Sequence, residues 1–277
     1  MKSIPCEKSS GLFLCAVRLD ELQTLAQMST LPQPHRAPNL STSYYWNGEV
    51  IRSRSVSDIV LSGTVDVASP SARLMADWER EISLHLSLEP GDVEALPLAR
   101  ARTRWPDYRH CVQAVSDWTI ALGLQDVLAS SDVALMACRG AKYHHDGEQY
   151  GGAAFCNLFL SEDKGLDLHF ASTGHRIPLV RGTVVIFDTG QPHAVIQRNG
   201  NGNGHGFNAA DFPPDHDCTL VFLTWELPIE NVLVGHALGI TFDVNPSTAS
   251  LLDDEQVWVN GVRVGVCPDS GRWCQAD

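Results

Sequence analysis

Two stretches in the first half of the chain repeat apolar residues at the spacing of an α-helix. The first follows Ser71 and is expected to end before Pro90 and Gly91, because proline and glycine stop helices. The second covers residues 108–128. Apolar residues share one face of each stretch: Leu74, Trp78, Ile82 and Leu86 in the first, and Val112, Val115, Trp118 and Leu122 in the second. We therefore predict two helices here.

After Ser130 the helical spacing gives way to short apolar runs separated by turn residues. The runs are VALMAC, AFCNLFL, LDLHF, RIPLV, TVVIF, HAVIQ and TLVFLTWEL, and most are bounded by Gly, Pro, Asp or Asn. Many short strands with turns between them are typical of a β-sandwich or barrel. Residues 131–230 are therefore predicted to form a β core.

Other segments are predicted from turn residues. The sequence PQPHRAPN indicates a proline-rich loop within residues 1–70, whose pattern is otherwise mixed. Residues 199–217 are too polar and glycine-rich for regular structure, and a loop of that length is usually either functional or disordered. VWVNGVRV predicts a β-hairpin, because Asn260 and Gly261 can both adopt the positive φ of a type I′ turn.

Together these patterns predict one domain, mainly β with flanking helices (an α+β class). A chain of 277 residues can bury one large core, and barrels of this size commonly form a single domain. We expect an N-terminal helical support region over residues 1–130, the β core over 131–230 and a C-terminal β-hairpin extension over 231–277.

Composition narrows the classes of partner. The 20 Lys and Arg against 33 Asp and Glu give a net charge of −13, which repels nucleic acid and anionic lipid. The chain has no apolar run of the length that a membrane span requires. Its first residues, MKSIPCEKSSGLFLCAV, are interpreted as mature protein rather than a signal peptide. We expect a cytoplasmic protein that binds neither nucleic acid nor membrane; the sequence does not indicate its oligomeric state.

The eight cysteines are scattered without a C-x-x-C pair. Several lie in apolar stretches, where a thiol behaves as a small hydrophobic group. This pattern favours a reducing compartment. The alternative is that Cys267 and Cys274, which flank PDSGRW, pair in an oxidising one.

The segment KYHHDGEQ carries the most informative chemistry. In a strand, alternate residues share a face, so His144 and Asp146 point the same way and His145 points the opposite way. A second imidazole from a distant strand would complete a two-histidine, one-carboxylate set, which leaves metal positions open and suits iron(II). His193 in FDTGQPHAVIQ is the best candidate, since it follows a Gly-Gln-Pro turn and opens a β-branched run.

The alternative is that these residues have no functional role. His-x-Asp is common by chance, so His145 and Asp146 can be a surface pair and His193 a turn residue. A structural zinc site is disfavoured, because such sites prefer four ligands rich in cysteine and no cysteine accompanies the motif.

The order of motifs between residues 133 and 227 resembles the iron(II)/2-oxoglutarate-dependent oxygenases, especially their prolyl-hydroxylase-like branch. VALMACRGAKYHHD is similar to the strand and His-x-Asp motif of that branch, and KGLDLHF to its glycine-rich strand. LVRGTVVIFDTGQPHAV is similar to the strand that leads to its second iron histidine, and TLVFLTWEL to its last core strand.

The resemblance implies a double-stranded β-helix, a jelly-roll barrel of the cupin kind, buttressed by the N-terminal helices. It implies Fe(II) held by His144, Asp146 and His193 as the catalytic residues, with 2-oxoglutarate as cosubstrate. The implied reaction uses molecular oxygen to hydroxylate a C–H bond of a small molecule or amino-acid-like substrate, with release of succinate and carbon dioxide. An aspartate at position 146 favours oxygenation over halogenation.

The chain departs from that family where the cosubstrate carboxylate should bind. Thr219 stands at the position where the branch carries an arginine, whose fork matches a carboxylate. We expect Arg198 to bind the cosubstrate with Thr219 as a hydroxyl donor, although strand alternation places Arg198 opposite His193 unless a bulge intervenes. Arg139 is expected to meet the substrate. For each arginine the alternative is a solvated surface charge.

Two amides complete the candidate set. Asn157 and Gln197 are expected on the inner face, where they would contact the substrate or cosubstrate or orient a ligand imidazole; the alternative is a satisfied core amide. Arg176 and Arg181 flank IPLV and are further candidates for the oxo acid. His169 is expected to face outward, and neither it nor His175 is assigned to the metal.

Two other functions stay open from the sequence. One is an iron dioxygenase of cupin type in which the substrate itself binds the metal, which the missing arginine favours. The other is a non-catalytic β-barrel binding module that keeps the motif without the activity.

Overall fold

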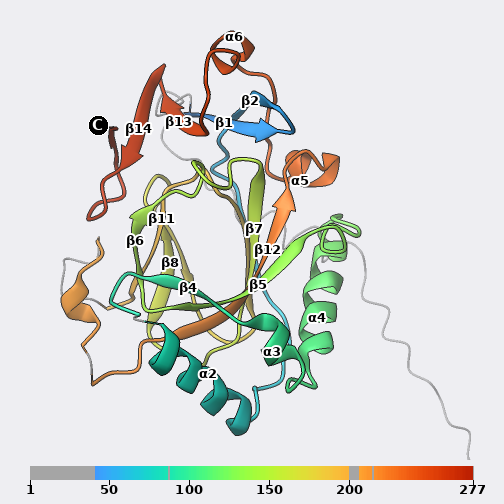
Figure 1. The fold of residues 1–277 in the computed structure, drawn as a ribbon, viewed down its shortest axis with the longest axis vertical. Coiled ribbons are helices and arrows are strands. Elements are labelled where there is room, and N and C mark those ends of the chain that lie inside the picture. Colours follow the sequence, from blue (N-terminus) through green and yellow to red (C-terminus); the bar gives the residue numbers. More distant parts are fainter. Residues whose placement is uncertain (1–40, 87, 200–205, 214, 277) are drawn as a thin grey trace, which may run out of the picture. The chain divides into compact units, whose positions relative to one another are not determined.

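The computed structural model describes residues 41–86, 88–199, 206–213 and 215–276, and most of its regular structure is β. Its strands form three antiparallel sheets (Figure 1). The largest has the order β3-β10-β7-β12-β5-β4. These strands are β3 (Val60–Thr64), β10 (Thr183–Asp188), β7 (Ala153–Phe159), β12 (Leu220–Pro228), β5 (Asp132–Cys138) and β4 (Val93–Leu96).

The second sheet has four strands in the order β6-β11-β8-β9. They are β6 (Ala141–His144), β11 (His193–Gln197), β8 (Leu166–Phe170) and β9 (His175–Pro178). From β5 to β12 the chain passes back and forth between these two sheets, because β5, β7, β10 and β12 belong to the first and β6, β8, β9 and β11 to the second. Every apolar run predicted as a strand overlaps one of these elements.

One buried cluster takes residues from both sheets, so the sheets pack face to face. Residues two apart on a strand share a face, and Val185 and Phe187 of β10 both belong to this cluster. They lie there with Phe222 of β12 and with Leu168 and Phe170 of β8, a strand of the other sheet. Directly paired residues of β8 and β11 share a face, so His193 lies on the same side as Phe170. That histidine therefore faces the space between the sheets.

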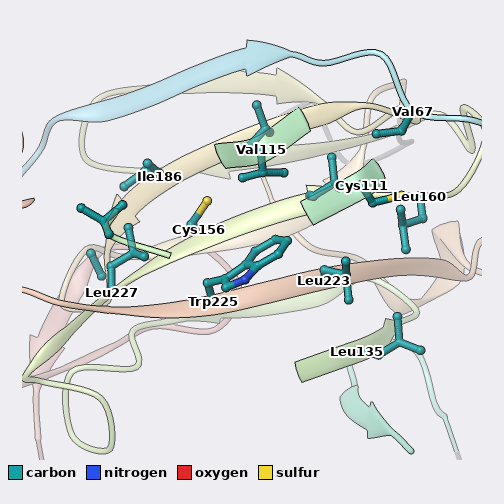
Figure 2. Packing of buried hydrophobic residues seen from close by; sticks show 14 of the residues in the cluster. Val67, Cys111, Val115, Leu135, Cys156, Leu160, Ile186, Leu223, Trp225 and Leu227 are labelled. Atoms are coloured by element: carbon teal, nitrogen blue, oxygen red, sulfur yellow. The ribbon is translucent and has the colours of Figure 1, made fainter. Parts of the chain in front are cut away.

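The opposite face of the six-stranded sheet is covered by helices. They are α2 (Ala72–His85), α3 (Leu98–Arg102) and α4 (Tyr108–Ala121). Figure 2 shows the second cluster, in which Cys111 and Val115 of α4 pack with Leu223 and Trp225 of β12. Trp225 is 2% exposed, so the interface between the helices and the sheet is closely packed and stabilises the sheet on the face opposite the second sheet.

Both predicted helices are present, with different agreement at their ends. Helix α2 begins after Ser71, whose hydroxyl accepts a hydrogen bond from the Leu74 N–H, and it ends before Pro90 as expected. Helix α4 ends at Ala121 rather than near residue 128. Gly123 adopts φ +81° there, a conformation that closes helices and suits glycine.

The third sheet was not predicted beyond its hairpin. Its order is β15-β14-β13-β1-β2, formed by β15 (Trp273–Gln275), β14 (Val262–Val266), β13 (Gln256–Val259), β1 (Ser41–Asn47) and β2 (Val50–Ser55). The type I′ turn is confirmed, since Asn260 and Gly261 have φ values of 52° and 79°. Residues 1–130 thus supply strands as well as helices.

Short elements complete the described chain. They are the 3₁₀ turn η1 (Ala209–Asp211), α5 (Val232–Ala237) and α6 (Pro246–Ala249). The segment PQPHRAPN lies outside the described residues. Among those described, no helix has the length and apolar character needed to cross a membrane. Cys267 and Cys274 are free thiols.

Candidate metal centre

Two neighbouring strands and the turn after one of them bring three predicted ligands together. His144 ends β6 and is the direct cross-strand partner of His193, which begins β11, so both imidazoles leave the sheet on the same face. Their ring centroids are 4.4 Å apart. Asp146 follows two residues after His144, and one ligand atom from each of the three residues lies within 4.8 Å of the others. The convergence expected from strand alternation is therefore present.

Backbone carbonyls fix which ring nitrogen of each histidine carries the proton. Nδ1 of His144 lies 2.7 Å from the Lys142 carbonyl oxygen, and Nδ1 of His193 lies 2.9 Å from that of Gln191. Because a carbonyl only accepts hydrogen bonds, each Nδ1 donates, and in the neutral ring Nε2 keeps its lone pair. This is the outer-shell arrangement that orients metal-binding histidines in proteins.

The two free nitrogens face the two oxygens of one carboxylate. Nε2 of His144 is 3.6 Å from Oδ1 of Asp146, and Nε2 of His193 is 3.5 Å from Oδ2. These separations are too long for hydrogen bonds. Ligand atoms that each lie about 2 Å from one shared ion are about 3 Å apart, so a small inward movement of these side chains would place all three atoms around one ion.

The turns on either side of the ligands hold each other in place. The Asp146 N–H donates to the Thr189 carbonyl oxygen at 2.8 Å. In return, the Thr189 hydroxyl donates to the carbonyl oxygens of Tyr150 and Ala153 at 2.7 and 2.8 Å. The loop that carries the aspartate and the turn before His193 are therefore one hydrogen-bonded unit.

Burial favours neutral forms of the ligands in the metal-free protein. It lowers the pKa of His193 well below its usual value, and the neighbouring His144 lowers that pKa further. Burial also raises the pKa of the Asp146 carboxyl, and the nearby histidines act in the opposite direction. A neutral imidazole is the form that binds a metal, so the His193 environment suits a ligand.

The inner wall of the centre is aromatic. The ring of Phe187 lies 4.8 Å from that of His193, and the ring of Phe170 lies 6.2 Å from it. The side chain of His193 is only 7% exposed, whereas that of His144 is 38% exposed. The three ligands thus close the site toward the core and leave it open on the His144 side.

That open side faces a hollow of about 550 Å³. It is lined by His144, Asp146, Lys142 and residues 91–94 at the start of β4. Lys142 lies two residues before His144 and lines the same hollow, although the pairing of β6 with β11 shifts register between Ala141 and His144. This basic residue was not singled out from the sequence, although the i, i+2 spacing could have identified it.

The two residues expected to bind the oxo acid lie elsewhere. Arg198 is on the opposite face from His193, as plain alternation without a bulge requires, and its Nε donates to Asp167 at 2.8 Å and its Nη1 to Asp163 at 3.0 Å. Thr219 borders a separate cavity of about 420 Å³ beside α2, on the face of β12 that carries Val221. The structure brings neither residue to the triad, which corrects the expectation.

The other arginines are also engaged elsewhere. Arg139 donates through Nη2 to the carbonyl oxygens of Phe212 and Pro213, so it fixes the segment before residue 214. Arg176 lies 3.7 Å from Asp167, and Arg181 pairs with Glu162. Each therefore has a carboxylate or carbonyl partner away from the triad.

The polar residues expected on the inner face are there. Asn157 is directly paired with Val185 and Thr224, and its buried Oδ1 has no hydrogen-bond partner within the described residues. Gln197 lies on the His193 side and donates to the Cys218 thiol at 3.4 Å. His169 faces outward, where it contacts the Tyr143 hydroxyl, and His175 is exposed. The separation of these two histidines from the metal set is thus as expected.

Comparisons with known proteins give weak likenesses only. No family model matches the chain, and no curated protein matches it. Among solved structures, a prolyl-4-hydroxylase from Pseudomonas putida is 16% identical, with a TM-score of 0.35 over 61% of this chain and 92% of that one. The non-heme α-ketoglutarate-dependent epimerase SnoN from nogalamycin biosynthesis is 11% identical, with a TM-score of 0.34 over 61% of this chain and 78% of that one. The function is therefore argued from the geometry of this chain.

Proposed function

We propose that the protein is a non-haem iron(II) oxygenase whose metal is held by His144, Asp146 and His193. The observation that carries the proposal is the convergence of two unprotonated Nε2 atoms and one carboxylate within 4.8 Å. Two histidines and one carboxylate are the donor set of non-haem iron(II) oxygenases, and they leave metal positions free for other ligands. A structural zinc site, with its usual four protein ligands, fits this set less well.

The strand order supports a double-stranded β-helix as the scaffold. The chain from β5 to β12 alternates between two antiparallel sheets that share one buried cluster. Eight strands arranged in this way form the double-sheet jelly roll of the cupin kind. In this scaffold the two histidines lie on strands, which position a metal better than loops do, and Asp146 follows directly after β6.

We further propose that 2-oxoglutarate is the cosubstrate and that Lys142 binds one of its carboxylates. Lys142 and Arg176 are the only lysine and arginine inside the eight strands β5 to β12 themselves, the other basic residues of this segment being in the connections. Arg176 is paired with His169, on the opposite face of its sheet from His193. Lys142 lines the hollow beside His144 instead. With iron(II) bound, the metal would supply the activation of oxygen that hydroxylates a C–H bond as 2-oxoglutarate becomes succinate and carbon dioxide.

The hollow indicates the size of the substrate. Its volume of about 550 Å³ is within the range of small-molecule sites, which favours a small or amino-acid-like substrate. Asn157 remains a candidate contact, because its buried Oδ1 lacks a donor that a bound ligand could supply. Arg139 would act through the 207–213 segment that it holds rather than by direct contact.

Anaerobic metal titration followed by a turnover assay tests the proposal. Wild-type protein should bind Fe(II) or Co(II) at one site and convert 2-oxoglutarate to succinate in the presence of oxygen. His144→Ala and His193→Ala should lose both properties, since each removes a ligand. His175→Ala is the matched control, because this exposed histidine lies in β9, outside the ligand set, and should leave both intact. Equal metal binding in all four proteins would rule out the site.

The absence of a basic residue on β12 favours one other function. In an iron dioxygenase of cupin type the substrate itself binds the metal, and no carboxylate anchor for an oxo acid is required. Such an enzyme would bind Fe(II) through the same triad but form no succinate. The succinate measurement therefore separates the two functions, while metal binding without any oxidation would indicate a binding module.

A further inference from the structure

A fully buried ion pair lies beneath the turn that leads to His193. The guanidinium of Arg54 on β2 contacts the carboxylate of Asp188 at the end of β10 through two hydrogen bonds, Nη1 to Oδ2 at 2.7 Å and Nη2 to Oδ1 at 2.8 Å. Both side chains are 0% exposed. Such a fork-to-fork pair fixes the relative orientation of its two partners as well as their distance.

The aspartate also holds the backbone of the turn. Oδ1 of Asp188 accepts a hydrogen bond from the Gly190 N–H at 2.8 Å, and Oδ2 accepts one from the Ser57 N–H at 2.7 Å. A Cβ at Gly190 would lie 3.0 Å from a methyl group of Val56 and 3.3 Å from Oδ1, so the backbone approaches closely here. The carboxylate thus sets the path of residues 188–190.

That turn supplies the carbonyl groups that orient two of the three ligands. The Thr189 carbonyl accepts the Asp146 N–H at 2.8 Å, and the Gln191 carbonyl accepts Nδ1–H of His193 at 2.9 Å. A shift of the turn would therefore move Asp146 and His193 together.

The arginine reaches the loop on the other side of the centre as well. Its Nε donates to the Gly151 carbonyl oxygen at 2.8 Å. Gly151 belongs to the loop that follows Asp146 and that Thr189 also contacts through its hydroxyl. Arg54 consequently ties together the loop after one ligand and the turn before another.

We propose that the Arg54–Asp188 pair is a positioning device for the metal centre, acting through the turn 188–193 and the loop 147–152. The inference rests on the proposed metal-binding function. It makes the geometry of the triad depend on β2, a strand of the third sheet, which contributes no ligand itself. Groups that hydrogen-bond a ligand directly change metal affinity about 10- to 100-fold when they are removed, and this pair holds the turn whose carbonyl groups do so.

A double substitution separates positioning from stability. A buried ion pair can often be replaced by apolar residues of similar volume without loss of stability, whereas removal of one partner leaves a buried charge. The double variant Arg54→Met with Asp188→Leu should fold, yet it cannot donate to the Gly151 carbonyl or accept from the Gly190 N–H. The variant Asp188→Asn keeps the side-chain volume but leaves the Arg54 charge buried without its partner, so its folding is checked by urea denaturation beside its metal affinity.

The experiment is a Co(II) titration of these two variants and of the wild type, followed by the visible absorption of the bound ion. Both variants should bind Co(II) about 10- to 100-fold more weakly, with altered absorption bands, because the ligands lose their orientation. Arg52→Met is the matched control: Arg52 lies on the same strand and pairs with Glu230 and Asp243 at the surface. It should bind Co(II) like the wild type.

The possible failures are distinguishable. If a folded double variant and Asp188→Asn both bind Co(II) with wild-type affinity and spectrum, the positioning role is wrong while the metal site stands. If Arg52→Met weakens binding as much as Asp188→Asn does, the effect is general destabilisation and the inference is also wrong. If the wild type binds no Co(II), or binds it equally well after His193→Ala, the proposed function itself fails.

Discussion

The turn formed by residues 188–193 has a polar cluster at each end, and the two clusters differ in how completely the protein satisfies them. At Asp188 each carboxylate oxygen accepts two hydrogen bonds, from Arg54, Ser57 and Gly190. At His193 the carboxylate of Asp146 faces two Nε2 lone pairs, and the described residues supply no donor to any of them. The Asp188 cluster is therefore complete within the protein, whereas the cluster of His144, Asp146 and His193 is open, because its lone pairs stay available to a ligand.

The difference indicates what each cluster is for. Acceptors that face one another repel, so three of them brought together at a half-open site call for an explanation. A structural role would have supplied donors, as it did for Asp188. A ligand-binding role leaves them out, because a bound cation takes their place.

Arg54→Met should produce the largest loss of stability. It leaves the Asp188 carboxylate buried without its cation, which costs about 3–5 kcal/mol in the free energy of unfolding. Urea denaturation of the metal-free protein measures this. Arg52→Met should change that free energy by less than about 1 kcal/mol, since its pairs are partly exposed. Similar values for the two variants would mean that the complete cluster is not a structural element.

Metal should stabilise the wild type by the next largest amount. At a free concentration about 100 times its Kd, Co(II) adds about 2.7 kcal/mol to the free energy of unfolding, because it binds the folded chain alone. The shift in urea midpoint should vanish in His193→Ala and persist in His175→Ala. A urea midpoint that does not change when Co(II) is added to the wild type would contradict the interpretation that the open cluster binds a cation.

The sequence predicts the open cluster well because His144 and Asp146 are close along the chain and His193 stands out after its Gly-Gln-Pro turn at the start of a β-branched run. Alternation along a strand places His144 and Asp146 on one side, and it also places Arg198 opposite His193, where the structure has it. The same rule would have excluded Thr219, which faces α2 with Val221, had the start of β12 been known. The resemblance to a family pointed to Thr219 by position, but position along a strand does not give the face.

The complete cluster could not be predicted, because its parts are far apart along the chain. Arg54 and Asp188 are 134 residues apart, and β1 beside them pairs with β13 near the other end of the chain. No periodic pattern connects such positions. For any single arginine the sequence favours a solvated surface charge, so the burial of Arg54 could be recognised only once the pairing of the third sheet was known.

Lys142→Met sharpens the comparison on the open side. If Lys142 binds a carboxylate of 2-oxoglutarate, its loss should raise the KM for 2-oxoglutarate about tenfold, which corresponds to about 1.4 kcal/mol. Succinate formation at varied 2-oxoglutarate concentration measures this. Lys164→Met is the control, because Lys164 pairs with Asp217 and lines the separate cavity beside α2. An unchanged KM in Lys142→Met would mean that another residue binds the carboxylate of 2-oxoglutarate, or that the enzyme uses no oxo acid.

Asp146→Ala should have the smallest effect on the stability of the metal-free protein, and it tests the comparison most directly. The Asp146 carboxylate receives no hydrogen bond from a described residue, and its backbone N–H and C=O groups keep their partners when the side chain is removed. We expect the free energy of unfolding in the presence of a chelator to change by less than about 1 kcal/mol, with a gain in stability, since binding sites are often kept at a cost in stability. Asp188→Ala, which removes an acceptor of four hydrogen bonds, should lose far more under the same conditions. Equal losses in these two variants would show that Asp146 is a structural partner like Asp188, and the distinction between a complete cluster and an open one would be lost.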